Sequence, residues 1–207
     1  LDPTAPGAHG PRKHHNHIFT WEVGDEDGTN AVIDDADVVA TEEMYYHRTH
    51  PCPLEPCGSV ASMDKVNGKL TLYGTFQAPH VVRTVASLLS GIEEHNIRVV
   101  SPDIGGGFGN KVGVYPGYVC SIVASIVTGV PVKWVEDRME NLMSTAFARD
   151  YWMKGKISAT KEGKITGLHC HVTADHGAFD ACADPTKFPA GFMSICTGSY
   201  DIPIAYL

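Results

Sequence analysis

The chain has 207 residues, 43% of them hydrophobic and 19% charged, with a formal net charge of −8 at pH 7. This composition is typical of a protein with a packed core, and the acidic balance with scattered Lys and Arg argues against a nucleic-acid partner. No apolar run approaches the roughly 18 residues that a membrane-spanning helix needs.

Residues 1–57 are predicted to be mostly loop and extended chain. The segment 1–17 contains the run KHHNH at residues 13–17. No Cys or carboxylate is spaced to complete a metal site there, so we interpret these histidines as a surface or a subunit contact. We then expect a strand at residues 18–23, an acidic turn at 24–30, an extended stretch at 32–50 and a proline-rich break at 51–57.

The six cysteines, at positions 52, 57, 120, 170, 182 and 196, form no Cys-x-x-Cys pair. A secreted disulfide scaffold would be shorter and denser in cysteine. We therefore interpret them as reduced thiols that pack as small hydrophobic side chains.

Residues 60–63 and 69–76 are predicted to form a hairpin, because Asn67-Gly68 lies between two strand-like runs. Pro79 ends the second strand, and residues 81–91 have helical spacing. Gln77 therefore stands at the C-terminal end of a strand, where ligand sites of α/β proteins usually lie. Its carboxamide offers a donor and an acceptor without a charge, which suits an oxo group or a small neutral substrate. Taken alone, however, the position favours a structural role.

A glycine-rich loop at residues 101–111 (SPDIGGGFGNK) follows a strand predicted at 97–100 and precedes a helix predicted at 118–127. Its glycines leave backbone N–H groups bare and allow positive φ, so a ligand could approach the main chain closely. The alternative is a tight turn that needs glycine only for its geometry. The loop is neither a P-loop nor a dinucleotide fingerprint, because Asn110 occupies the position where either motif needs glycine.

The rest of the chain is predicted to be a strand at 132–135, a helix at 139–146, and a strand pair within 149–172 that turns at 161–164. We interpret Glu136-Asp137-Arg138 as a capped helix start with a local ion pair rather than as acid–base machinery. His169 and His171 point to one face of their strand and Cys170 to the other, so the three cannot share a metal. Asp175 and His176 are expected to hold a loop, since no Gly-x-Ser-x-Gly elbow supplies a serine for a hydrolase.

Four segments resemble the molybdenum hydroxylase (xanthine dehydrogenase) family: TFQAPH at 75–80, DIGGGFG at 103–109, VKWVEDR at 132–138 and ADHGAF at 174–179. Three more resemble the carbon monoxide dehydrogenase group of that family: KHHNH at 13–17, GNK at 109–111 and FDACADP at 179–185. Many other members of the family have glycine at the position of Asn110.

The resemblance implies an α+β (mixed α/β) fold and a molybdenum ion on molybdopterin cytosine dinucleotide. The candidate cofactor-binding residues are Gln77, Gly106, Gly107, Phe108 and Gly109. Gln77 is also the candidate catalytic residue, as a donor to an oxo ligand or as a group that orients the substrate. No residue of the chain is expected to ligate a metal. The cysteine that holds copper is expected beyond Leu207, and a glutamate base further downstream.

The carbon monoxide dehydrogenase group implies oxidation of CO with water to CO2 at a molybdenum–copper site. Electrons would pass to a small subunit with 2Fe–2S clusters and a medium subunit with FAD, in a dimer of heterotrimers. We expect the complex in the cytoplasm, with association at the inner face of the membrane left open.

The chain does not begin with Met, and its last residues read as a strand. We expect residues 1–207 to be the N-terminal part of a molybdopterin-binding domain, without turnover or a stable fold on its own. Two alternatives remain: a related molybdenum hydroxylase that oxidises aldehydes or N-heterocycles without copper, and a non-enzymatic nucleotide- or metal-binding module.

Overall fold

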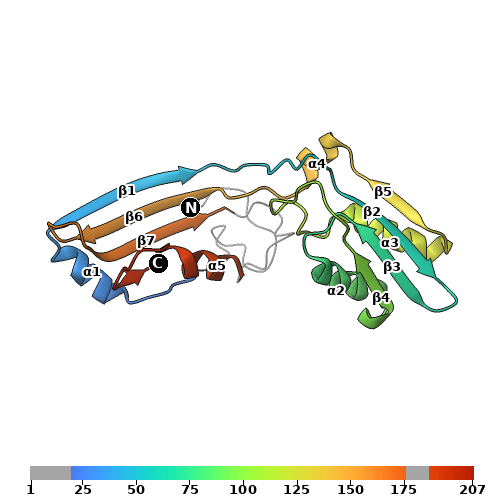
Figure 1. Cartoon of the computed structure of the whole chain (residues 1–207), viewed down its shortest axis with the longest axis horizontal. Helices are drawn as coiled ribbons and strands as arrows, with labels where there is room; N and C mark the ends of the chain where they lie inside the picture. The colour runs from blue at the N-terminus through green and yellow to red at the C-terminus, as the bar shows by residue number, and fades with distance from the viewer. Residues whose placement is uncertain (1–19, 176–186) are drawn as a thin grey trace, which may run out of the picture. The chain divides into compact units, whose positions relative to one another are not determined.

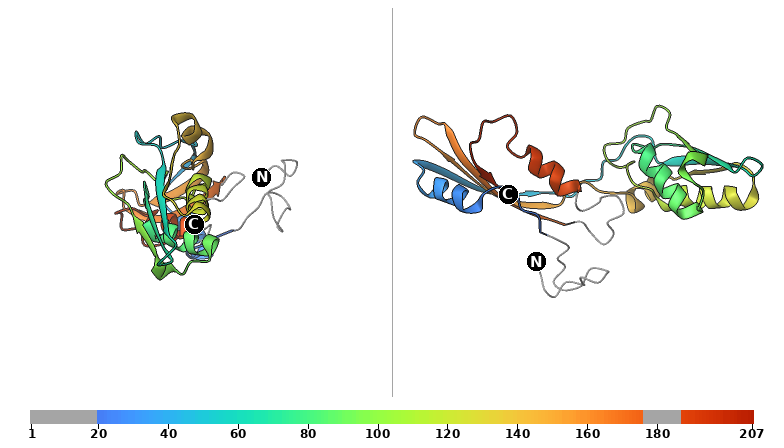
Figure 2. Two further views of the ribbon diagram at one scale, coloured as in Figure 1. Left: turned by 90° about the vertical axis from the view of Figure 1, so that its right-hand side faces the viewer. Right: turned by 90° about the horizontal axis from the view of Figure 1, so that it is seen from below.

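The computed structural model describes residues 20–175 and 187–207, which divide into two compact units (Figures 1 and 2). The central unit comprises residues 49–148, and the discontinuous unit comprises residues 1–48 together with 149–207. Each combines helices with a four-stranded sheet, which confirms the α+β class. Within the described ranges, no helix has the length and apolar character that crossing a bilayer requires.

The central unit contains a sheet in the order β4-β3-β2-β5 (Figure 1). Strands β2 (Gly58–Asp64) and β3 (Lys69–Gly74) form an antiparallel hairpin with Gly68 at φ +66. The Asn-Gly hairpin prediction is therefore confirmed. Strand β4 (Ile97–Val100) pairs parallel to β3, and β5 (Val132–Val135) pairs antiparallel to β2.

Helices α2 (Pro79–Ser90) and α3 (Pro116–Thr128) lie side by side against the central sheet (Figure 2, right). Each begins with proline, whose missing N–H is no loss in the first turn of a helix. Each ends at a glycine in the left-handed conformation, Gly91 or Gly129. A short 3-10 helix (Glu94–Asn96) leads from α2 into β4, and helix α4 (Arg138–Ser144) follows β5. The helices predicted at 81–91, 118–127 and 139–146 are confirmed.

The core of the central unit lies between the sheet and these two long helices. Its buried side chains alternate along β3 and recur one turn apart on α2 and α3: Leu70, Leu72, Val82, Ala86, Tyr118 and Ile122. The ring of Tyr118 meets Phe76 edge-on at 5.0 Å between centroids. Because Phe76 is anchored in this core, the backbone position of the next residue, Gln77, is fixed.

The discontinuous unit contains a second sheet in the order β1-β6-β7-β8 (Figure 1). Strand β1 (Val38–Tyr46) pairs antiparallel to β6 (Tyr151–Ala159), which forms a hairpin with β7 (Ile165–Ala174). Strand β8 (Ala205–Tyr206) pairs parallel to β7. Helix α1 (Glu26–Asp34) packs on β6 and β7, and α5 (Lys187–Ile195) precedes β8. The hairpin predicted within 149–172 is confirmed.

Three predictions for the start of the described chain were wrong. Residues 20–23 form no strand, and the expected acidic turn at 24–30 is the first part of α1. The stretch predicted to be extended at 32–50 begins with the last residues of α1, and its strand starts only at Val38. The Asp25 side chain accepts the N–H of Gly28 at 3.0 Å and caps the helix. Glu26 and Asp27 lie in its first turn, where negative charge is favourable. The acidic cluster is thus a helix start rather than a turn.

Candidate functional site

Gln77 and the glycine loop lie together because they follow β3 and β4, which are parallel neighbours in the central sheet. The Gln77 N–H donates to the Lys111 carbonyl at 2.9 Å. Its side-chain Oε1 accepts the backbone N–H groups of Gly109 and Lys111, each at 3.0 Å. Two N–H donors on one atom identify that atom as the oxygen.

The other end of the Gln77 carboxamide has no hydrogen-bond partner within the described residues, and the side chain is exposed. Because Oε1 is occupied by the loop, Nε2 is left to present two N–H donors elsewhere. The side chain therefore joins the loop at its oxygen and remains a donor at its nitrogen.

The glycine loop adds backbone donors beside this amide. Among the described residues, no acceptor is found for the N–H groups of Gly106, Gly107 or Phe108. Positive φ values at Gly106 (+91) and Gly109 (+89), and at Phe108 (53), turn the backbone here. Successive N–H groups of this kind form a concavity that suits an anionic or oxo group.

At Gly107 the backbone of the loop lies so close to the Gln77 side chain that an added Cβ would clash with it. A Cβ on Gly107 would lie 2.4 Å from the Gln77 Cδ. A larger residue at 107 would therefore have to displace the Gln77 carboxamide or the loop.

The base of the loop is fixed by an ion pair between a buried lysine and a partly exposed glutamate. The Lys111 side chain is 0% exposed, and its Nζ lies 2.7 Å from the Glu55 Oε2. The same oxygen accepts the Gly105 N–H at 2.7 Å. Burial raises the pKa of the Glu55 carboxyl, but Lys111 and the Gly105 N–H outweigh it and hold the pKa below its ordinary value.

A second network fixes the loop through Asn110, which is fully buried. Its Nδ2 donates to the Thr145 Oγ1 at 2.7 Å, and its Oδ1 accepts from the Asn141 Nδ2 at 3.3 Å. The Tyr115 hydroxyl donates to the Asn110 carbonyl. Asn110 thus ties the loop to the residues at the end of α4 and contributes no free donor.

Residues 136–138 support the loop's surroundings and show no acid–base arrangement. Asp137 caps α4 in a capping box with Glu140, which confirms the predicted helix start. The buried Glu136 accepts from the Cys57 N–H at 2.6 Å and from Asn141. The predicted local ion pair is not found in the described part of the chain, because Arg138 donates instead to the Leu54 and Pro53 carbonyls and to Asn141.

The described histidines and cysteines form no metal site. Within residues 20–175 and 187–207, no three His, Cys, Asp or Glu side chains gather to hold an ion. His169 bonds Asn30 at 2.9 Å and His171 lies on the same strand, as expected of sheet residues. Burial raises the pKa of the Cys57 thiol to about 12, so it is an unreactive packed thiol.

Asp175 lies 3.4 Å from Arg48, which agrees with its predicted role of holding a loop. The histidines at 13–17, as well as His176, Cys182 and segment 179–185, lie outside the described residues.

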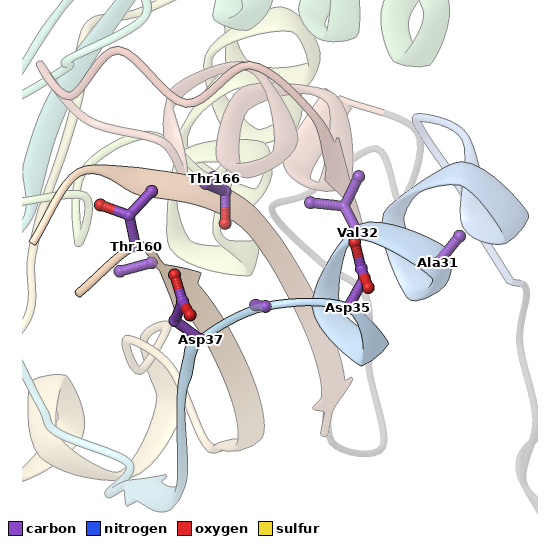
Figure 3. A pocket seen from close by; sticks show the side chains of 8 residues that line it. Ala31, Val32, Asp35, Asp37, Thr160 and Thr166 are labelled. Carbon is purple, nitrogen blue, oxygen red and sulfur yellow. The ribbon is translucent and has the colours of Figure 1, made fainter.

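The described part of the chain contains a pocket of about 360 Å³ in the discontinuous unit. It is lined by α1 and by the β6–β7 hairpin, with Asp35, Asp37, Thr160 and Thr166 among its residues (Figure 3). The Lys161 Nζ lies 3.6 Å from the Asp37 Oδ1, and no predicted site residue lines this pocket. A second pocket, of about 280 Å³, has Tyr115, Trp134 and Glu136 among its lining residues. Neither contains Gln77.

Residues 9–207 match the family model of the molybdopterin cofactor-binding domain. The chain belongs to this family. The carbon monoxide dehydrogenase large chain of Afipia carboxidovorans is 70% identical to this chain over 201 residues, which are 97% of this chain and 25% of that one. A crystal structure of Cu,Mo-CO dehydrogenase superposes with a TM-score of 0.85 at 70% identity, over 97% of this chain and 25% of that chain.

A more distant relative is the nicotine 6-hydroxylase large subunit of Paenarthrobacter nicotinovorans. It is 37% identical over 164 residues, which are 77% of this chain and 20% of that one. The chain spans about a quarter of the length of the first two relatives.

The sequence did not reveal the ion pair that holds the glycine loop. Lys111 was singled out only as the last residue of the glycine loop and of the GNK segment, and Glu55 lies in the predicted proline-rich break. The two are 56 positions apart, so no local pattern connects them. A buried lysine needs a counter-charge, but the sequence alone does not show that Lys111 is buried.

Proposed function

We propose that the chain is the N-terminal part of the molybdopterin-binding domain of an aerobic carbon monoxide dehydrogenase large subunit. The complete enzyme oxidises CO with water to CO2 and passes two electrons to its partner subunits. The observation that carries this proposal is the 70% identity to a carbon monoxide dehydrogenase large chain, against 37% to a large subunit that hydroxylates nicotine.

The residues of the central unit fit a molybdenum cofactor with oxo ligands. Gly106, Gly107 and Phe108 offer backbone donors, and Gln77 offers Nε2. A set of donors without a facing acceptor suits an oxo or phosphate oxygen. The bound molybdenum–copper centre would supply the two-electron acceptor and the metal that binds CO.

In this proposal the chain's own residues orient the cofactor or substrate and stabilise negative charge that develops during the reaction. Gln77 donates from Nε2 to an oxo ligand or to the reacting substrate, while the loop holds its Oε1. The N–H groups of Gly106 to Phe108 would hold the cofactor. Donors fixed before the reaction stabilise developing negative charge without reorganisation, which is often the largest contribution to rate.

The finer assignments belong to the same proposal. They are the cytosine dinucleotide form of the cofactor and a copper-ligating cysteine beyond Leu207. They include a small 2Fe–2S subunit and a medium FAD subunit, a dimer of heterotrimers and a cytoplasmic location. Among the described cysteines, Cys57 is a poor copper ligand because it is 0% exposed and its thiol resists ionisation.

The test uses the full-length large subunit produced with its two partner subunits. We expect molybdenum and copper in the purified complex, cytidine monophosphate on acid hydrolysis, and reduction of a dye that depends on CO. Molybdenum without copper, with oxidation of an N-heterocycle or aldehyde and no reaction with CO, would establish the related hydroxylase instead. Absence of molybdenum and pterin would favour the non-enzymatic module.

A further inference from the structure

We propose that Glu55 and Lys111 are positioning residues whose ion pair sets the direction in which Gln77 presents its Nε2 donors. This inference rests on the proposed function for the role of Gln77. The connection itself consists of contacts within the central unit.

Lys111 is the link between the ion pair and Gln77. Its backbone N–H donates to the Gln77 Oε1 at 3.0 Å, and its carbonyl accepts the Gln77 N–H at 2.9 Å. Its side chain runs through the protein interior to the Glu55 Oε2 at 2.7 Å. One residue therefore holds Gln77 with its main chain and Glu55 with its ammonium group.

Glu55 joins the two ends of the loop. Its Oε2 accepts both the Lys111 Nζ and the Gly105 N–H, and its own N–H donates to the Gly105 carbonyl at 3.3 Å. A Cβ on Gly105 would lie 2.5 Å from the Glu55 Cβ, so the two backbones are in close contact. Both ends of the segment from Gly105 to Lys111 therefore bind Glu55.

The segment between these anchors would not keep its shape unaided. Phe108 holds φ 53 without being glycine, and such conformations persist only where the surroundings over-determine them. Asn110 anchors the loop on one side, and the ion pair anchors the other. If the ion pair is lost, Lys111 keeps a buried ammonium without its counter-charge and must move. The N–H of Lys111 then leaves the Gln77 Oε1, and the carboxamide is free to rotate.

The experiment uses the complete holoenzyme with the variants Glu55→Gln and Lys111→Met. Leu70→Ala is the control, because Leu70 is fully buried in β3 of the same unit and forms none of these contacts. For each enzyme we would measure molybdenum and pterin content, the electron paramagnetic resonance spectrum of the reduced molybdenum, kcat and KM.

We expect Glu55→Gln to retain molybdenum, to change the resonance spectrum and to lower kcat about tenfold to a hundredfold, since small displacements of positioned groups cost that much. KM should change much less. The double variant should be no worse than the more impaired single variant, because both remove one interaction. Leu70→Ala should lower thermal stability and leave the spectrum and kcat unchanged.

Two results would overturn the proposal: a spectrum and kcat of Glu55→Gln equal to those of the wild type, or a pattern equal to that of Leu70→Ala. If Lys111→Met loses the cofactor, Glu55→Gln alone still tests the proposal, because glutamine can accept the Gly105 N–H and keep the loop folded. A failure of the proposed function appears separately, as a wild-type enzyme that contains molybdenum but does not oxidise CO. In that case the electron paramagnetic resonance spectra of the variants still show whether the ion pair positions Gln77 at the molybdenum.

Discussion

The carboxamide of Gln77 has two ends with separate roles. The oxygen is bound by the N–H groups of Gly109 and Lys111, and the nitrogen is left as a donor. An amide held in this way cannot exchange its ends without placing an N–H against two other N–H groups. The direction of the donor is therefore fixed before any ligand arrives.

Replacing Gln77 by glutamate separates these two roles. A carboxylate keeps an acceptor for Gly109 and Lys111 but removes the Nε2 donors and adds a negative charge where we propose that an oxo ligand binds. In the full complex we expect Gln77→Glu to retain molybdenum and to lower kcat at least about a hundredfold, the cost of losing one positioned donor. Steady-state kinetics with metal analysis checks this. Turnover like that of the wild type would remove Gln77 from the site.

Glu55 predicts a pH dependence with a definite sign. Its folded-state pKa lies below the ordinary value, so ionised Glu55 stabilises the folded state. This contribution is present above the unfolded pKa of about 4.3 and is lost as the pH falls through the lower folded pKa. Because the side chain is 40% exposed, we expect a contribution of only about 1 kcal/mol.

The measurement is the unfolding midpoint of the large subunit between pH 7 and about pH 3, for the wild type and Glu55→Gln. The wild type should have the higher unfolding midpoint at neutral pH. The difference in midpoint between the two proteins should shrink below about pH 4.3, where the glutamate of the unfolded chain becomes protonated. Parallel curves over the whole range would contradict this assignment.

At the scale of elements, the site depends on the parallel pairing of β3 and β4. Gln77 follows β3, the glycine loop follows β4, and α2 connects the two strands. The strands therefore end at the same edge of the sheet and bring Gln77 against the loop. Close backbone approach is then possible only where the loop carries glycine.

Gly107→Ala tests this close approach. An alanine Cβ would lie 2.4 Å from the Gln77 Cδ, so either the loop or the carboxamide must move. We expect lower molybdenum content and at least about tenfold lower kcat. The control is Gly155→Ala in β6, where an added Cβ meets nothing within 4 Å and φ is not positive, so it should behave like the wild type. Full molybdenum content and normal turnover in Gly107→Ala would show that the loop has more room than the structure indicates.

The sequence predicted local pairings well and distant ones poorly. The β2–β3 hairpin follows from Asn67-Gly68, and proline starts with glycine ends delimit α2 and α3. Gln77 and the glycine loop were each predicted to follow a strand, and they meet because both strands belong to one strand–helix–strand unit. Helix α1 was missed because its acidic cap resembles a turn until the residues that pack against it are known. The Glu55–Lys111 pair was missed because its partners are far apart in sequence and the burial of Lys111 depends on the tertiary fold.

At the scale of the whole molecule, one sheet is completed by residues from both sides of the central unit. Strand β1 pairs with β6 from Val38↔Ala159 to Tyr46↔Tyr151. Within the central unit, the first and last residues are paired: the Thr49 N–H donates to Ala148 at 2.9 Å and the Ala148 N–H to Thr49 at 2.8 Å. The central unit therefore begins and ends at one point, and its sheet needs no strand from outside residues 49–148.

This insertion dictates an order of folding on the ribosome. Strand β1 is synthesised about a hundred residues before β6, an interval of roughly 5–20 s at ordinary rates of translation. During that time its side chains, which include Val38, Val39, Met44 and Tyr46, have no partner strand. The strands of the central sheet pair with one another, so we expect the central unit to fold in this interval. Its closure at Thr49 and Ala148 then shortens the effective loop between β1 and β6 and lowers the entropy cost of pairing them.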